Sequence, residues 1–241
     1  MSKRQEIRGR RQRARLRSRL PVILMITAGA LLVAFALILP SLDRGPEISV
    51  NPSTPRDLGT LVDGTSLGDP NAPVRIDVWE DFQCPACKTY TEVTETQIIT
   101  NYVLTGQVFY TFHFFPFIDG RQAGGESQQS ANAAMCALEQ GMFWEYHDLL
   151  YANWDGENRG AFADARLEAF AEYLELDMDA FDTCFSTNRY SNYINQDYLE
   201  GQVAGVQGTP SVFVNGTLIT PGYVPGFETL SQAIEALLPN P

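Results

Sequence analysis

Asp81-Phe82-Gln83-Cys84-Pro85-Ala86-Cys87 is the stretch of this sequence that decides its predicted fold. It follows residues 74–79, where apolar and charged side chains alternate as in a half-buried strand. It precedes residues 88–103, whose apolar side chains can form one face of a helix. A Cys-x-x-Cys at such a strand-to-helix junction is typical of a redox site.

The position of Cys84 at the start of a helix predicts its chemistry. The first amides of a helix have no intrahelical partner, and the peptide dipoles place partial positive charge there. A thiolate at Cys84 is therefore favoured, and we predict that Cys84 is the catalytic nucleophile. Cys87 lies one turn deeper and is more shielded, so we predict that it resolves a mixed disulfide on Cys84.

A structural zinc site is the alternative interpretation of the two cysteines. Such a site needs about four ligands, usually from a second close pair of Cys or His. The other candidate ligands are not paired at ligand spacing: Cys136, Cys184, His113 and His147. The sequence therefore predicts no metal and no other cofactor. His113 lies within an aromatic and β-branched strand, residues 108–115, and is expected to be a packed core residue without a partner.

The charge of the chain is unevenly distributed. Residues 1–20 contain nine Lys or Arg and one Glu, a net charge of +8, whereas residues 41–241 have a net charge of −20. Between them, residues 22–39 contain no charge and are long enough to cross most of a bilayer. A cleaved signal peptide is the alternative, but its apolar region would be shorter and a small-x-small cleavage pattern is missing. We therefore expect an uncleaved signal-anchor.

The basic cluster orients this anchor. Positive residues are retained in the cytoplasm, so the protein is expected in the cell membrane with a single pass, a cytoplasmic N-terminus and an extracytoplasmic catalytic domain. Because the cluster directly adjoins the span, no nucleic-acid partner is expected. Residues 41–72 are rich in Pro, Gly, Ser, Thr and Asp and are interpreted as a linker with at most one short edge strand.

The rest of the chain predicts a helical block followed by a return to strand. Five helices are expected between residues 122 and 206, at 127–139, 143–154, 166–174, 179–185 and 190–206. Asn215-Gly216 between two β-branched runs predicts a hairpin, and residues 227–238 predict a last helix. Cys136 and Cys184 fall in two of the five helices; they form either a disulfide, if the domain is exported, or two buried thiols.

The predicted order along the chain is strand, Cys-Pro-Ala-Cys, helix, strand, helical block, Val206-Gln207-Gly208-Thr209-Pro210-Ser211, hairpin and helix. This order resembles the DsbA-like branch of the thioredoxin superfamily, in its membrane-anchored form. The resemblance covers about residues 68–238. It implies a cis Pro210 facing the cysteine pair, Thr209 as a backbone partner for an extended substrate, Pro85 and Ala86 as active-site support, and a structural Cys136–Cys184 disulfide.

The predicted fold class is therefore α/β: a thioredoxin fold with an inserted helical subdomain, preceded by one transmembrane helix. The predicted domains are a basic cytoplasmic segment (1–20), the anchor (21–40), the linker (41–72), the thioredoxin-fold domain (73–121 and 207–241) and the helical insert (122–206).

The predicted function is a membrane-tethered thiol:disulfide oxidoreductase that introduces disulfides into extracytoplasmic, cysteine-containing client proteins. A membrane redox partner, such as a quinone-linked DsbB- or VKOR-like protein, would regenerate its disulfide. The alternatives are a disulfide reductase or isomerase, or a non-catalytic thioredoxin-fold chaperone or adaptor.

Two departures from the family pattern affect the expected chemistry. Ala86 stands where many DsbA-like oxidants have His, so one source of thiolate stabilisation is missing. Val78 stands where the family often has a buried acid that assists proton transfer to the second cysteine. Asp77 and Glu80 flank Val78 and are expected to point elsewhere.

Overall fold

The computed structural model describes residues 25, 29, 33–35, 48–120 and 124–239. The chain divides into two units, Met1–Ser49 and Val50–Pro241. The predicted basic segment, 1–20, lies outside the described residues, and those residues of the predicted anchor that are described are helical. Within the described parts of the chain, no helix combines the length and the apolar character that crossing a membrane requires.

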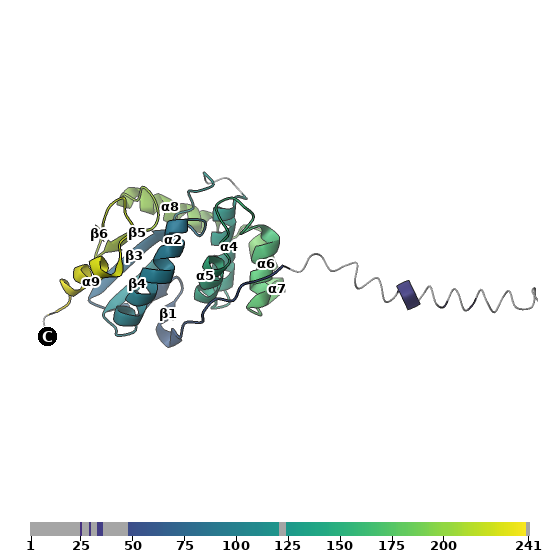
Figure 1. Cartoon of the computed structure of the whole chain (residues 1–241), viewed down its shortest axis with the longest axis horizontal. Helices are drawn as coiled ribbons and strands as arrows, with labels where there is room; N and C mark the ends of the chain where they lie inside the picture. The colour runs from purple at the N-terminus through teal and green to yellow at the C-terminus, as the bar shows by residue number, and fades with distance from the viewer. Residues whose placement is uncertain (1–24, 26–28, 30–32, 36–47, 121–123, 240–241) are drawn as a thin grey trace, which may run out of the picture. The chain divides into compact units, whose positions relative to one another are not determined.

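The second unit is built on a mixed β-sheet (Figure 1). Its described strands are β1 (Val62–Asp63), β2 (Ser66–Leu67), β3 (Val74–Glu80), β4 (Val108–Phe114), β5 (Ser211–Val214) and β6 (Thr217–Leu218), in the order β1-β2-β4-β3-β5-β6. The central strands β3 and β4 are parallel, and every other pairing is antiparallel. The parallel pair requires a crossover, which the helical segment after the Cys-x-x-Cys motif supplies.

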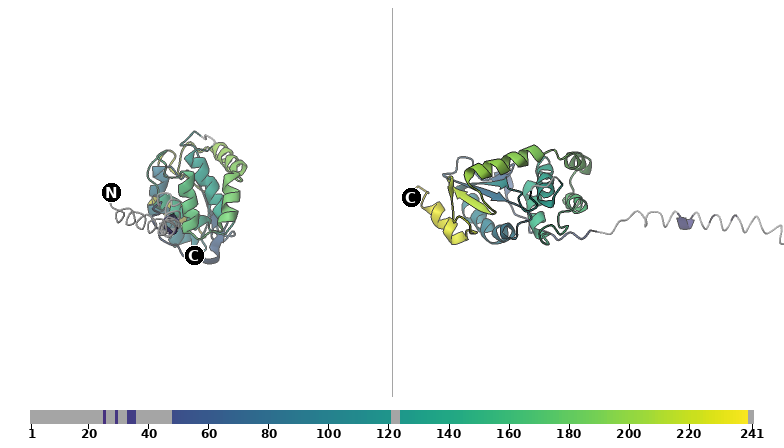
Figure 2. Two further views of the ribbon diagram at one scale, coloured as in Figure 1. Left: turned by 90° about the vertical axis from the view of Figure 1, so that its right-hand side faces the viewer. Right: turned by 90° about the horizontal axis from the view of Figure 1, so that it is seen from above.

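Helices cover both faces of this sheet. The crossover consists of α2 (Pro85–Tyr90), η2 (Thr91–Glu95), α3 (Thr96–Ile98) and η3 (Ile99–Val103), where η2 and η3 have π-helical hydrogen bonds. This segment and α9 (Phe227–Glu235) lie over one face, and α8 (Ser191–Ala204) lies over the other (Figure 2). A helical cluster at the end of the sheet contains α4 (Glu126–Leu138), α5 (Phe143–Ala152), α6 (Asp164–Tyr173) and α7 (Met178–Ser186).

These elements confirm the predicted strand, five-helix block, hairpin and last helix. One part of the predicted domain division is wrong. Residues 62–67 form β1 and β2 of the sheet, and residues from Val50 onward belong to the folded unit, so the linker predicted at 41–72 ends earlier than expected. The composition of this segment is that of a linker, but its few apolar side chains, such as Leu58 and Leu67, are buried in the core.

Trp79 connects β3 to α8 on the second face of the sheet. Its ring packs against Phe115, Val206 and Phe213 in a small apolar cluster. Gly201 on α8 permits the close approach of this helix, since an added Cβ would lie 2.7 Å from Trp79 Cδ1. Real Cβ atoms do not approach other atoms so closely, so any other residue at position 201 would push α8 away from the sheet.

His113 on β4 also lies on this face, and it has partners that the sequence did not reveal. Its Nδ1 is 2.8 Å from Asp197 Oδ1 on α8, and its Nε2 is 3.3 Å from Asp77 Oδ1 on β3. Asp197 also accepts a hydrogen bond from the Phe114 amide. Burial by itself lowers the pKa of His113, but the hydrogen bonds to Asp197 and Asp77 outweigh it and raise the pKa to about 9. The expectation of a His113 without partners is therefore wrong.

This cluster predicts a loss of stability at alkaline pH. Because the folded-state pKa of His113 is raised, its contribution is fully present below about pH 6.5 and is lost as the pH rises through about 9. We expect the free energy of unfolding in urea to fall by about 2–3 kcal/mol across this window. The variant His113→Gln should lack this fall; parallel pH curves for the two proteins would contradict the assignment.

Candidate active site

Cys84 lies at the junction between β3 and α2, as the N-cap residue of α2. Pro85 occupies the first turn of the helix, where a missing N–H costs nothing. Both Cys84 and Cys87 are free thiols in this structure. Cys84 retains 5% of its surface exposed and Cys87 retains none, so an external sulfur can reach only the first cysteine.

The surroundings of Cys84 favour its thiolate. A hydrogen bond with the Cys87 thiol makes the largest contribution, and it outweighs burial to lower the pKa of Cys84 to about 6. Thr209 and the backbone amides of Cys87 and Ala86 lower the pKa further. The amide contributions are those expected at a helix N-terminus. Cys84 is therefore mostly ionised at neutral pH without a histidine at position 86.

Cys87 has the opposite properties. Complete burial, and after it the hydrogen bond to Cys84, raise the pKa of Cys87 well above its ordinary value. The two sulfurs therefore differ in protonation, with an ionised Cys84 beside a protonated Cys87. Because of this asymmetry, Cys84 is suited to attack a disulfide and to depart as a thiolate. Cys87 instead needs a proton when its bond to Cys84 breaks.

Glu80 supplies a buried carboxyl group beneath the two cysteines. It is the last residue of β3 and lies on the same face as Ile76 and Val78, so the expectation that it points elsewhere is wrong. Its Oε2 accepts a hydrogen bond of 2.7 Å from the Tyr151 hydroxyl, and its Oε1 has no partner among the described residues. Burial and then the charge of Glu95 raise the pKa of Glu80 well above its usual range. An acid is thus present two residues later than in the family pattern.

Asp81 and Gln83, for which no sequence pattern indicates a role, fix the loop before Cys84. Asp81 Oδ2 accepts hydrogen bonds from the amides of Phe117 and Ile118 and from the Ser127 hydroxyl. The carbonyl of Gln83 accepts a hydrogen bond of 2.7 Å from Trp154 Nε1. The loop is therefore tied both to the end of β4 and to the helical cluster.

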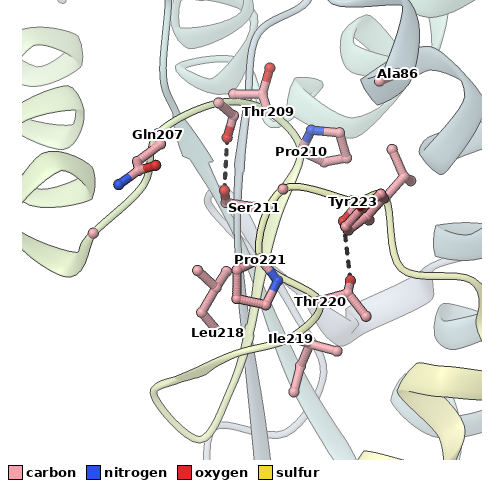
Figure 3. Close-up of a pocket in the computed structure, with 14 residues that line it drawn as sticks. Ala86, Gln207, Thr209, Pro210, Ser211, Leu218, Ile219, Thr220, Pro221 and Tyr223 are labelled. Atoms are coloured by element: carbon pink, nitrogen blue, oxygen red, sulfur yellow. Dashed lines mark hydrogen bonds between the residues drawn. The ribbon is translucent and has the colours of Figure 1, made fainter.

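Thr209 and Pro210 lie on the other side of Cys84. The peptide bond between them is cis, and Cys84 Sγ lies 3.3 Å from the Thr209 carbonyl oxygen, to which the thiol donates a hydrogen bond when it is protonated. A groove of about 530 Å³ begins here. Ala86, Thr209, Pro210, Leu218 and the exposed Tyr223 are among the residues that line it (Figure 3). The groove places apolar side chains and a backbone edge beside the reactive sulfur.

Cys136 on α4 and Cys184 on α7 form a disulfide in this structure. Both residues are fully buried within the helical cluster. The structure therefore pairs them with each other and not with Cys84 or Cys87, and the bond joins two helices of the cluster.

An asymmetric cysteine pair at a helix N-terminus, opposite a cis proline on a mixed sheet, defines the class of DsbA-like thiol:disulfide oxidoreductases. The family model described as Thioredoxin matches residues 60–236. The chain belongs to this family, and the predicted resemblance to DsbA-like proteins is confirmed, while its membrane-anchored form stays a prediction.

Curated relatives of two differently named kinds match the chain. A probable disulfide bond formation protein D of Bacillus cereus is 30% identical over 174 residues, which are 70% of this chain and 76% of that protein. Na(+)/H(+) antiporter NhaA 3 of Salinispora tropica is 35% identical over 167 residues, 69% of this chain. The chain spans only 24% of the length of that antiporter.

Solved structures show the same fold. Oxidised BdbD of Bacillus subtilis superposes with a TM-score of 0.64 at 19% identity, covering 78% of this chain and 98% of that one. DsbA of Chlamydia trachomatis gives a TM-score of 0.60 at 23% identity and covers 77% of this chain and 97% of its own. The predicted thioredoxin fold with a helical insert is therefore confirmed.

Proposed function

We propose that this protein introduces disulfides into cysteine-containing proteins outside the cytoplasm, tethered to the membrane by residues 21–40. The lowered pKa of Cys84 carries the proposal, because a stabilised thiolate favours the reduced form and makes the disulfide a strong oxidant. The basic segment before an uncharged stretch supports the tether and its orientation. A membrane protein of the quinone-linked type would reoxidise the cysteine pair.

The first step is attack by a client thiolate on the Cys84–Cys87 disulfide. The client sulfur bonds to Cys84, which is the exposed partner, and the bond between Cys84 and Cys87 breaks. Cys87 leaves as a thiolate in a site that disfavours its charge. Glu80 is held protonated by burial and lies where it can donate the proton that Cys87 needs.

The second step releases the oxidised client. A second client thiolate attacks the client sulfur of the mixed disulfide, and Cys84 departs as a thiolate. Its low pKa makes it a good leaving group. An extended client segment in the groove beside Thr209 and Pro210 would hold both client sulfurs close to Cys84.

Glu80→Gln tests the proton donor. The amide fills the same space but cannot protonate Cys87, so we expect reduction of the Cys84–Cys87 disulfide by a small thiol to slow on the order of 10²-fold. The rate is measured by stopped-flow mixing with a reducing thiol across pH 5–8. Glu92→Gln is the matched control, because Glu92 is an exposed carboxylate that pairs with Lys88. Equal rates for both variants would remove Glu80 from the mechanism.

The direction of exchange is tested by equilibrating the full-length protein with glutathione buffers. We expect a reduction potential clearly less negative than the roughly −270 mV of thioredoxin. Alkylation of the reduced protein should in addition show Cys84 titrating near pH 6. A potential at or below that of thioredoxin would favour the reductase alternative.

A further inference from the structure

Residues 50–58, here called the strap, precede the region that the family model matches. The strap passes along α5 toward β1 (Figure 1). Asn51 and Asn153 exchange two hydrogen bonds, Asn51 N to Oδ1 at 2.7 Å and Asn153 Nδ2 to the Asn51 carbonyl at 2.8 Å. Leu58 is buried at the other end. The strap is thus fixed at both ends across the helical cluster.

Arg56 is the one cation that the strap contributes to the interior. Its Nη1 lies 2.6 Å from Glu95 Oε1, and its Nε lies 2.8 Å from Asp148 Oδ2, with a second contact from Nη2 to Asp148. The guanidinium also lies over the Trp144 ring at 5.3 Å from its centroid. Its side chain is only 14% exposed, and that of Glu95 is fully buried. This is a shared ion pair, shielded from solvent.

This ion pair adjoins the carboxyl group beneath the catalytic cysteines. His147 and Tyr151 stand one turn apart on α5 with ring centroids 5.0 Å apart. His147 contacts Asp148 and lies 3.9 Å from Glu95, while Tyr151 binds Glu80. A negative charge on Glu95 raises the pKa of Glu80, and Glu80 interacts in turn with Cys87. An uninterrupted sequence of buried groups therefore joins Arg56 to the cysteine pair.

The charge of this cluster bears on the redox equilibrium. Reducing the disulfide creates a Cys84 thiolate, so negative charge nearby disfavours the reduced form and positive charge favours it. Such interactions are stronger in a buried site than in water because screening is weaker. Glu95, Asp148 and Arg56 together carry one net negative charge, whereas the two carboxylates without Arg56 would carry two.

We propose that Arg56 is a positioning residue that sets the reduction potential of the Cys84–Cys87 pair by neutralising the buried carboxylate of Glu95. The strap therefore belongs functionally to the active site, although it lies outside the thioredoxin fold. The inference rests on the proposed thiol exchange.

The reduction potential of full-length variants tests this proposal. The reaction is protein disulfide plus two glutathione giving protein dithiol plus glutathione disulfide. Arg56→Gln is expected to lower its equilibrium constant about tenfold, which is about 30 mV for a two-electron couple. Glu95→Gln should raise this equilibrium constant. The double variant Arg56→Gln/Glu95→Gln restores the net charge of the cluster, so its equilibrium constant should lie within about threefold of that of the wild type.

Two further variants separate charge from packing. Arg56→Lys retains the cation and is expected to keep the wild-type potential. Arg189→Gln removes a partly exposed arginine from its ion pair with Glu139 on the helical cluster and should leave the potential unchanged. If Arg56→Gln does not fold, as judged by circular dichroism, the opposite shift in Glu95→Gln carries the test.

The outcomes distinguish this inference from the proposed function. A wild-type protein that exchanges with glutathione while Arg56→Gln and Glu95→Gln keep its potential would overturn the role of Arg56 alone. A shift of equal size in Arg189→Gln would also overturn it. A wild-type protein that does not exchange at all would overturn the proposed function itself.

Discussion

Cys84→Ser is expected to reduce disulfide exchange with a cysteine-containing peptide by at least about 10³-fold, because a serine hydroxyl does not ionise near neutral pH and forms no disulfide. The loss is measured as the rate at which the oxidised protein forms a disulfide in a reduced two-cysteine peptide. Since Cys84 is a small residue at the start of α2, the change should leave the fold intact.

Cys87→Ser is the informative comparison. This variant retains the reactive Cys84 but lacks the sulfur that resolves a mixed disulfide, so it should accumulate a covalent adduct with glutathione or peptide that mass spectrometry detects. Full exchange activity in Cys84→Ser would contradict the mechanism. Suppression of client aggregation by Cys84→Ser, with exchange lost in both variants, would support the chaperone alternative as a second activity.

Cys136→Ala/Cys184→Ala is expected to destabilise the protein by about 4 kcal/mol, from the loop entropy of a cross-link between cysteines 48 residues apart. For a folded unit of this size, the loss corresponds to a fall in Tm of about 8–16 °C. The measurement is urea or thermal unfolding of the wild type and the double variant. Cys84→Ser/Cys87→Ser serves as the control for removing two cysteines, and an equal loss of stability in both proteins would refute the assignment.

Much of the fold is predictable because its elements have clear local signals. The alternation in β3, the helical periods between residues 122 and 206, and the Asn215-Gly216 turn each specify an element without reference to the rest of the chain. Cys84 and Cys87 are predictable as a site for the same reason, because their chemistry follows from one strand-to-helix junction.

The missed residues depend on contacts between distant segments. The two-residue period of β3 places Glu80 on the same face as Val78, but its partner Tyr151 lies 71 residues later in the sequence, and no local pattern indicates a buried carboxyl group there. His113 finds Asp197 84 residues later in the sequence. Arg56 lies in a segment with the composition of a linker, and no local pattern indicates that a single arginine there is buried between two carboxylates.

The hydrogen bonds from Trp154 and Ser127 to the loop before Cys84 limit how the active site can be transferred to another protein. Because residues of the helical cluster hold the backbone and the Asp81 side chain of this loop, Cys-Pro-Ala-Cys transplanted alone into a minimal thioredoxin scaffold would lose those supports. A chimera intended to inherit the redox behaviour of this protein must carry α4 and the segment around Trp154 together with the tetrapeptide.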